Sequence, residues 1–335
     1  MATKNKVKIR IPNNKRIAIT LGDPEGIGPE IVYRSLRDYI PSYPVVIIGS
    51  REIYEDKTIP SIRTLEEIEG KDKGLFFYHI GLPTFIPAPN SGNLNNNLTN
   101  LTNVTEASFS YVQTGIQWAL EKKIAALVTA PISKEKWLRA GIPYRGHTEL
   151  LAQTARVKDH AMVFWSDDLK VALFSVHIPL KEIFKRIKKN KIIHFIRFVN
   201  IELSRLFSKD FTFLVSGLNP HAGEDGFLGK EEIDEIIPAI NVLKEEINIY
   251  GPFPPDVIFL KAKEMKDTIV VSWYHDQGLI AFKLLNIHKG VNLTIGLPYI
   301  RTSPDHGTAY DIAGKGIADP SSMKEAIRLA EFLIS

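Results

Sequence analysis

Residues 16–30 read Arg-Ile-Ala-Ile-Thr-Leu-Gly-Asp-Pro-Glu-Gly-Ile-Gly-Pro-Glu. The largely apolar run at the start is typical of a buried strand. The glycines that follow predict a tight turn into a helix that begins near Pro29, because proline suits the first helical positions. A strand, a glycine turn and a helix in this order favour an α/β fold with parallel strands.

The same alternation continues along the chain. Further strands are expected at residues 44–48, 124–129, 161–165, 169–176, 211–218, 257–260, 268–273 and 291–295. Further helices are expected at residues 105–122, 147–156, 193–206, 230–246 and 322–333. Residues 251–255, Gly-Pro-Phe-Pro-Pro, indicate a rigid turn rather than a linker between domains.

Composition excludes several classes of protein. The chain of 335 residues predicts roughly two domains. Its 42 Lys and Arg are dispersed among 38 Asp and Glu, which argues against a nucleic-acid partner. Cysteine is absent, so disulfides are excluded and any metal site must use His, Asp, Glu, carbonyls or water. The first 14 residues are not typical of a secretory signal, and no apolar run could span a membrane. We therefore expect a cytoplasmic enzyme.

Three of the nine histidines stand directly after apolar runs: His177, His221 and His275. Side chains at the carboxyl ends of strands converge on one edge of an α/β sheet. Neutral imidazoles bind ions such as zinc or cobalt, and three of them with an open fourth position are typical of a catalytic metal site. Each histidine taken alone is more often an ordinary loop residue than a metal ligand.

Two turns are candidates for binding anions. The glycine turn at residues 22–30 could hold a pyrophosphate, although Ile31 stands where the dinucleotide-binding fingerprint requires a third glycine. His147 and Thr148 open a helix, whose N-terminus favours phosphate or carboxylate. A plain tight turn and a plain helix cap remain the alternatives.

Polar residues of the last third of the chain also suit an anionic substrate. Lys283 and Arg301 carry positive charge, and Arg301 could hold a phosphate or carboxylate through two hydrogen bonds. Asn292 lies between them in the sequence. Each of the two cations is also compatible with an ordinary surface charge.

Six blocks of sequence, taken in order, resemble the 4-hydroxythreonine-4-phosphate dehydrogenase (PdxA) family of vitamin B6 biosynthesis. They occupy residues 22–30, 129–134 (Thr-Ala-Pro-Ile-Ser-Lys), 146–149 (Gly-His-Thr-Glu), 218–224 (Leu-Asn-Pro-His-Ala-Gly-Glu), 274–278 (Tyr-His-Asp-Gln-Gly) and 291–309. The resemblance extends from about Arg16 to the C-terminus. One departure is Glu25, which stands where the family turn usually has alanine.

The resemblance implies a fold similar to the isocitrate and isopropylmalate dehydrogenases. Two α/β/α domains with mostly parallel sheets would enclose a cleft. Residues 14–128 with 296–335 would form the first domain, and residues 129–295 would form the second, which carries the metal-binding histidines. The resemblance also implies a homodimer whose active site lies at the subunit interface.

The resemblance further implies roles for particular residues. His177, His221 and His275 would bind a divalent metal (Zn, Co or Mg), with ligands drawn from both subunits. The substrate-binding set would be His147, Thr148, Lys283, Asn292 and Arg301. Asp276, or Asp305 with His306, is a candidate for proton transfer, and support of a loop is the alternative role. The cofactor would be NAD or NADP, with its binding residues unassigned.

The implied reaction is NAD(P)-dependent oxidation of 4-phosphooxy-L-threonine at C3, followed by decarboxylation to 3-amino-2-oxopropyl phosphate. A paralogous dehydrogenase of 4-phosphothreonate or 4-phosphoerythronate is the nearest alternative. The three histidines alone are also compatible with a metal-dependent hydrolase or lyase, and the fold with a phosphotransacetylase-like acyltransferase.

Overall fold

The computed structural model describes residues 15–82, 93–286 and 288–335, with the backbone alone at residues 93–103. The chain divides into two compact units. Unit 1 comprises Asp159–Gly296, and unit 2 comprises the described residues up to Lys158 together with Leu297–Ser335. The predicted domains, residues 14–128 with 296–335 and residues 129–295, differ from these units at the first boundary. The segment from residue 129 to 158 lies in unit 2 because its helices pack against a long helix of that unit.

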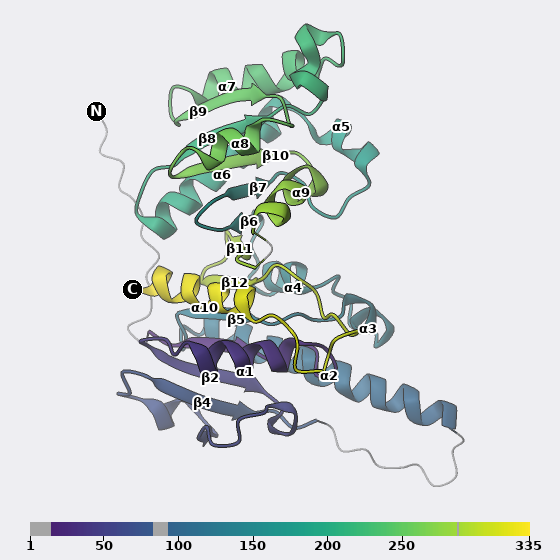
Figure 1. Cartoon of the computed structure of the whole chain (residues 1–335), viewed down its shortest axis with the longest axis vertical. Helices are drawn as coiled ribbons and strands as arrows, with labels where there is room; N and C mark the ends of the chain where they lie inside the picture. The colour runs from purple at the N-terminus through teal and green to yellow at the C-terminus, as the bar shows by residue number, and fades with distance from the viewer. Residues whose placement is uncertain (1–14, 83–92, 287) are drawn as a thin grey trace. The chain divides into compact units, whose positions relative to one another are not determined.

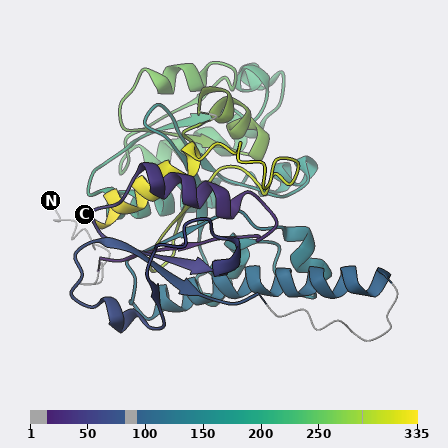
Figure 2. The same ribbon diagram turned by 60° about the horizontal axis from the view of Figure 1, so that its bottom comes forward.

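Unit 2 is a parallel sheet covered by helices. Its elements are β1 (Ile17–Thr20), α1 (Gly28–Asp38), β2 (Pro44–Gly49), β3 (Ser61–Ile62), β4 (Gly74–His79), α2 (Asn93–Leu120), β5 (Ala126–Thr129), α3 (Lys134–Arg139), α4 (His147–Thr154), β12 (Ile300–Pro304) and α10 (Ser321–Ile334). The strand order is β3-β4-β2-β1-β5-β12, and these strand pairs are parallel. Helices α1 and α10 pack together in front of the sheet, and α2 passes behind it (Figure 1). In both views α2 extends well past the sheet (Figure 2).

The glycine turn brings α1 close to the ends of β1 and β5. Gly22 adopts φ +72°, and a Cβ on it would lie 2.2 Å from the carbonyl oxygen of Pro131. A Cβ on Gly28 would lie 2.2 Å from the carbonyl oxygen of Leu21. Only glycine permits approaches this close. The turn at residues 22–28 is therefore packed against its neighbours.

Unit 1 is a mixed sheet covered on both faces. Its elements are β6 (Ala161–Trp165), β7 (Lys170–Leu173), α5 (Ile183–Arg186), α6 (Lys189–Phe207), β8 (Thr212–Ser216), α7 (Ile237–Leu243), β9 (Ile249–Phe253), α8 (Ile258–Lys263), β10 (Thr268–Ser272), α9 (His275–Asn286) and β11 (Val291–Ile295). The strand order is β11-β6-β7-β10-β8-β9. Strand β6 runs antiparallel to both β11 and β7, and the other pairs are parallel. Helices α8 and α9 lie in front of this sheet and α6 lies behind it (Figure 1).

The core of unit 1 fixes α9 on the sheet. Phe282 of α9 is fully buried, and its ring meets that of Phe164 edge to face at 5.6 Å between centroids. Leu279 of the same helix packs in this cluster with Val171 of β7 and Val270 of β10. Burial of this apolar surface holds α9, which begins at His275, against β7 and β10.

The mostly parallel α/β fold predicted from the sequence is confirmed. The strand expected at residues 257–260 is wrong, because these residues enter α8, which buries Ile258, Phe259 and Ala262 at helical spacing. The helix expected from residue 105 begins at Asn93. The strands β3, β4, β9 and β12 were not expected. Within the described chain, no helix combines the length and the apolar character needed to cross a membrane.

Candidate functional site

The predicted metal ligands follow three neighbouring strands of unit 1. Strands β7, β10 and β8 are adjacent and parallel, so their carboxyl ends share one edge of the sheet. His177 follows β7, His275 begins α9 after β10, and His221 lies in the 3-10 segment Pro220–Gly226 after β8. Three imidazoles at one sheet edge are the arrangement expected for ligand binding in α/β folds.

The structure brings two of these rings together. The centroids of the His177 and His275 rings are 5.6 Å apart. Two imidazoles that bind one ion at about 2.1 Å place their centroids roughly 5 Å apart. The Asp276 carboxylate lies 2.6 Å from Nδ1 of His275. This contact orients the ring, a usual role for a carboxylate beside a metal-binding histidine. The pair therefore fits two ligands of one divalent ion.

His221 lies in an unusual loop. Residues 221–225 all have positive φ, between 43° and 85°. The side chain of His221 is 67% exposed, and its Nδ1 lies 3.7 Å from the Glu224 carboxylate. Across the described part of the chain, no group of three His, Asp or Glu side chains is assembled closely enough to hold a metal. Within one chain, His221 is thus near the same sheet edge as the pair without completing a three-ligand set.

Unit 2 holds three of the predicted substrate-binding residues. Arg301 of β12 is 2% exposed, and its Nη2 donates a 2.7 Å hydrogen bond to Oγ1 of Thr129 at the end of β5. His147 and Thr148 begin α4, whose N-cap is Gly146. The His147 Nε2 atom is buried and has no hydrogen-bond partner among the described residues. A buried ring nitrogen without a partner is a candidate for binding a ligand.

The electrostatic environment of this region is positive. Burial lowers the pKa of His147 well below its usual value, and the charges of Arg301 and Lys134 lower it further. Burial also lowers the pKa of Arg301 to about 10, so the guanidinium stays charged at neutral pH. A phosphate group bound here would meet the Arg301 charge and the amino end of α4.

Sequence reasoning missed Lys134 and Thr129 as site residues. Both belong to the 129–134 block, but neither stands in a motif with a known chemical role. The Lys134 stem lies against Gly146, where a Cβ would lie 3.0 Å from the Lys134 Cε atom. Only the fold brings this block beside His147 and Arg301.

The other predicted site residues belong to other elements. Lys283 is exposed on α9, and Asn292 is partly buried on β11, so both belong to unit 1 with the histidines. Asp305 follows β12 in unit 2, where its backbone N–H donates to Oγ of Ser322 at 3.1 Å. That bond attaches the loop to α10, in keeping with a supporting role for this residue. A role in proton transfer remains a prediction for Asp276 and Asp305.

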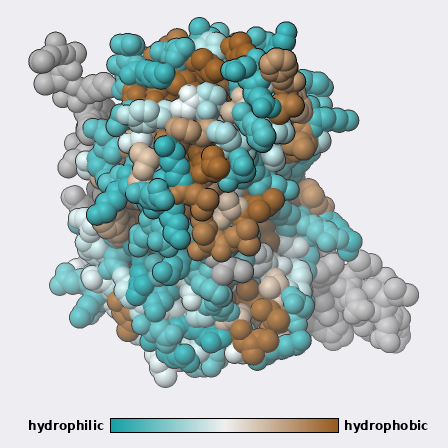
Figure 3. Space-filling model, turned by 45° about the horizontal axis from the view of Figure 1, so that its top comes forward, coloured by the Kyte–Doolittle hydropathy of each residue, from teal (hydrophilic) through white to brown (hydrophobic). Residues whose placement is uncertain are grey.

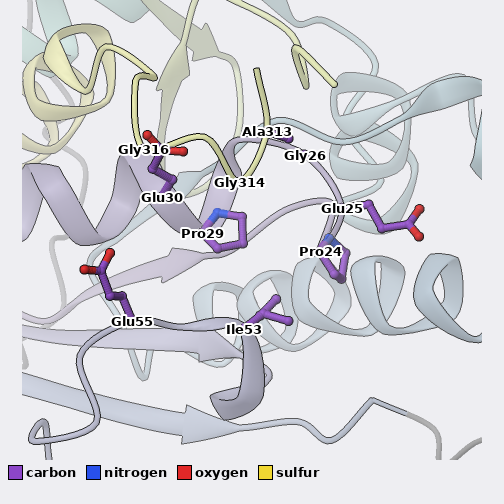
Figure 4. Close-up of a pocket in the computed structure, with 10 residues that line it drawn as sticks. All are labelled: Pro24, Glu25, Gly26, Pro29, Glu30, Ile53, Glu55, Ala313, Gly314 and Gly316. Atoms are coloured by element: carbon purple, nitrogen blue, oxygen red, sulfur yellow. The ribbon is translucent and has the colours of Figure 1, made fainter. Parts of the chain in front are cut away.

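Unit 2 also contains a pocket beside the glycine turn. It has a volume of about 380 Å³. Its walls come from the turn, the start of α1, the segment after β2 and the loop before α10 (Figure 4). The lining residues are Pro24, Glu25, Gly26, Pro29, Glu30, Ile53, Glu55, Ala313, Gly314 and Gly316. The glycine turn, which the sequence offered as a candidate for binding an anion, thus forms one wall of a pocket whose charged lining residues are carboxylates.

A charged cluster holds this turn in place. Asp23 is buried, accepts a hydrogen bond from the Tyr310 hydroxyl at 2.5 Å and lies 3.2 Å from the Lys136 ammonium. Lys136 also pairs with Glu25 at 2.6 Å and lies 4.3 Å from the centre of the Tyr310 ring. These contacts join the turn to α3 and to the loop before α10.

Comparisons with family models, related sequences and solved structures all point to one protein family. The family model described as pyridoxal phosphate biosynthetic protein PdxA matches residues 43–330. The 4-hydroxythreonine-4-phosphate dehydrogenase of Aquifex aeolicus is 40% identical, over 96% of this chain and 99% of its own length. The D-threonate 4-phosphate dehydrogenase of Pectobacterium atrosepticum is 37% identical, over 95% of this chain and 98% of its own length. A crystal structure of 4-hydroxythreonine-4-phosphate dehydrogenase from Klebsiella pneumoniae has a TM-score of 0.79 at 35% identity, covering 96% of this chain and 100% of that one.

Proposed function

This chain belongs to the PdxA family, and from that premise we propose that it oxidises 4-phosphooxy-L-threonine at C3 with NAD or NADP. The keto acid product then loses CO₂ to give 3-amino-2-oxopropyl phosphate, which serves pyridoxal 5'-phosphate biosynthesis. The observation that carries this proposal is the buried positive region around Arg301 and His147, which suits a phosphate. The reaction would take place in the cytoplasm.

Each group of residues has a distinct task in this proposal. Arg301 binds the substrate phosphate, with Thr129 holding the guanidinium in place. Because its pKa is lowered, His147 is neutral at physiological pH and can donate a hydrogen bond to the substrate or accept one from it. Thr148 and the backbone N–H groups at the start of α4 add further hydrogen-bond donors. Lys283 and Asn292 contact the remaining polar groups of the substrate. The NAD or NADP accepts the two electrons of the oxidation.

The histidines of unit 1 would hold a divalent metal. His177 and His275 supply two ligands, and His221 supplies the third, with the partner subunit contributing to the site. Asp276 orients His275 through the contact at Nδ1. A bound Zn, Co or Mg ion lowers the pKa of an alcohol that it contacts and stabilises an enolate.

The nucleotide end of the cofactor would occupy the pocket beside the glycine turn. Its volume of about 380 Å³ lies at the lower end of the range for ligand pockets, enough for a nucleoside. Gly314 and Gly316, where a Cβ would meet no protein atom within 4 Å, leave the backbone open to a ligand. The apolar surfaces of Pro24, Pro29 and Ile53 suit a flat base.

We also propose that the chain forms a homodimer. Helix α9 carries His275 and Lys283, yet its side chains Ile280 and Leu284 are 63% and 79% exposed. Figure 3 shows hydrophobic side chains gathered in groups on the surface among hydrophilic ones. An exposed apolar face beside a site residue favours a protein interface at that site.

The experiment is a substrate panel on metal-stripped and metal-restored enzyme. Reduced cofactor is followed by absorbance with 4-phosphooxy-L-threonine, D-threonate 4-phosphate and 4-phosphoerythronate. We expect metal-dependent reduction with 4-phosphooxy-L-threonine. Activity confined to D-threonate 4-phosphate, the substrate named for the Pectobacterium relative, would transfer the assignment to that reaction. Consumption of substrate without cofactor reduction would indicate a hydrolase or lyase instead.

A further inference from the structure

Glu232 is a buried carboxylate beside the loop that carries His221. It is 1% exposed and begins the π-helical turn Glu232–Ile236, which leads into α7. Single π-helical turns of this kind occur frequently at functional sites. A buried carboxylate is stable only where hydrogen bonds or opposite charges offset its loss of water, so its partners indicate its task.

The hydrogen bonds that Glu232 accepts come from the first residues of this loop. Its Oε1 atom accepts from the backbone N–H groups of Leu218 at 2.7 Å and Asn219 at 2.8 Å. Its Oε2 atom accepts from Nδ2 of Asn219 at 2.9 Å. A Cβ on Gly223 would lie 2.8 Å from Oε2, so the carboxylate also lies against the middle of the loop. Glu232 therefore contacts residues 218–225 at two separate points.

The loop needs such support, because its backbone is left-handed over five consecutive residues. Residues 221–225 have φ between 43° and 85°, and four of the five are not glycine. This conformation is unfavourable for residues with a Cβ and persists only where surrounding contacts enforce it, commonly at functional sites. The backbone N–H of Ala222 donates to the carbonyl oxygen of Asn219 at 3.1 Å. Asn219 thus anchors the left-handed turn, and Glu232 holds Asn219 by both its backbone and its side chain.

The base of the loop is attached separately to the helix that carries His275. In α9, Nε2 of Gln277 donates to the carbonyl oxygen of Gly217 at 2.8 Å, and Oε1 of the same side chain accepts from the backbone N–H of Trp273 at 2.8 Å. These bonds fix the start of the loop relative to α9. The course of the loop beyond that point then depends on Glu232.

We propose that Glu232 is a positioning residue of the metal site: it holds residues 218–225 in the left-handed turn that presents His221 to a divalent ion. This inference rests on the proposed function, because it takes His221 as a metal ligand. Glu232 acts through the backbone N–H groups of the loop and is not itself a ligand. An ion that meets a preformed turn need not order the loop, so metal affinity depends on the reach of this carboxylate.

The test measures Co²⁺ binding by calorimetric titration of the metal-stripped full chain in wild type, Glu232→Asp and Glu232→Gln. Aspartate keeps the charge but withdraws the carboxylate from the loop by one methylene. Glutamine keeps the reach and one acceptor oxygen but loses the charge. Glu235→Gln is the matched control, because Glu235 belongs to the same π-helical turn but accepts from the backbone N–H of Lys189 in α6, at 2.7 Å. His221→Ala removes the ligand itself.

The account predicts different results for the two conservative variants. Glu232→Asp should raise the Kd for Co²⁺ by roughly tenfold or more and change the visible absorption of the bound ion, whereas Glu232→Gln and Glu235→Gln should stay within about threefold of wild type. A lower urea midpoint for Glu232→Asp with unchanged Co²⁺ affinity would show a merely structural role and overturn the inference. Greater weakening by glutamine than by aspartate would also overturn it, because charge rather than reach would then be decisive.

A second measurement uses the wild-type protein and does not depend on the folding of a variant. The backbone N–H groups of Leu218 and Asn219 should be protected from hydrogen exchange before metal is added, and Co²⁺ should change their protection little. Rapid exchange that only the metal suppresses would overturn the inference while leaving the ligand assignment intact. Unchanged Co²⁺ affinity in His221→Ala would instead show that the proposed metal site is wrong, and the inference with it.

Discussion

At the scale of single residues, His147 carries a direct prediction about pH. Its pKa in the folded protein is lowered, so below about pH 6.5 the unfolded chain binds a proton that the folded chain rejects. The free energy of unfolding should therefore fall as the pH drops below this value, by up to about 1.4 kcal/mol per pH unit. His147→Gln should flatten this part of the curve, as measured by urea denaturation between pH 7 and pH 5. Identical pH dependence in the two proteins would show that His147 is not held neutral.

Arg301 carries a prediction about substrate affinity. A buried guanidinium that grips a phosphate contributes to binding more than to the chemical step. Arg301→Gln should raise KM for the phosphorylated substrate by roughly 30-fold or more while kcat changes far less. Arg328→Gln serves as the control, because Arg328 is partly exposed on α10 and pairs with Glu325. A fall in kcat with unchanged KM would assign Arg301 another role.

The residues explain how much of the site the sequence could predict. The proximity of His177 and His275 was predictable because each follows an apolar strand, and the fold places those strands side by side. The place of Lys134 and Thr129 in the site was not predictable, because their approach to Arg301 and His147 depends on the packing of α3, α4 and β12. No local pattern encodes contacts over such separations in sequence.

At the scale of elements, the position of α9 depends on Gly278. A Cβ at Gly278 would lie 2.8 Å from Leu173 Cδ2 and from Val171 Cγ1, so either these packed side chains or α9 itself must shift to accept one. Gly278→Ala should keep the fold but weaken binding of Co²⁺ or Zn²⁺ by roughly tenfold or more, because His275 shifts relative to His177. Calorimetric titration measures this, with Gly307→Ala as control, since a Cβ there meets nothing within 4 Å. Unchanged metal affinity would show that metal binding does not depend on the position of α9.

Elements with strong apolar runs were predictable, and those with weak or mixed patterns were not. Strands β1, β2 and β5 are fully buried, and each was predicted from its β-branched or apolar residues. The segment at residues 257–260 has four residues whose pattern fits a strand or a helix equally well, and packing of α8 on β10 and β8 decides for the helix. Strand β12 contains Arg301 and Ser303, which are polar yet buried, so its sequence does not resemble a core strand.

At the scale of the whole molecule, the exposed face of α9 predicts a dimer. Leu284 is 79% exposed on the helix that carries His275. Leu284→Glu should shift the protein from dimer toward monomer in sedimentation experiments, because it places a charge in an apolar interface. The same substitution should also lower the metal content of the protein, because the proposed metal site includes a contribution from the partner subunit. A wild-type protein that sediments as a monomer at assay concentration would contradict the proposed homodimer.

The most direct test of the central claim compares each substrate with its dephosphorylated form under identical conditions. The claim is that the buried positive region of unit 2 binds the phosphate of an alcohol that is then oxidised. It predicts that kcat/KM for 4-phosphooxy-L-threonine exceeds that for 4-hydroxy-L-threonine by roughly a thousandfold or more, since several charge-assisted hydrogen bonds are lost together. Equal kcat/KM values for the two compounds would contradict the claim.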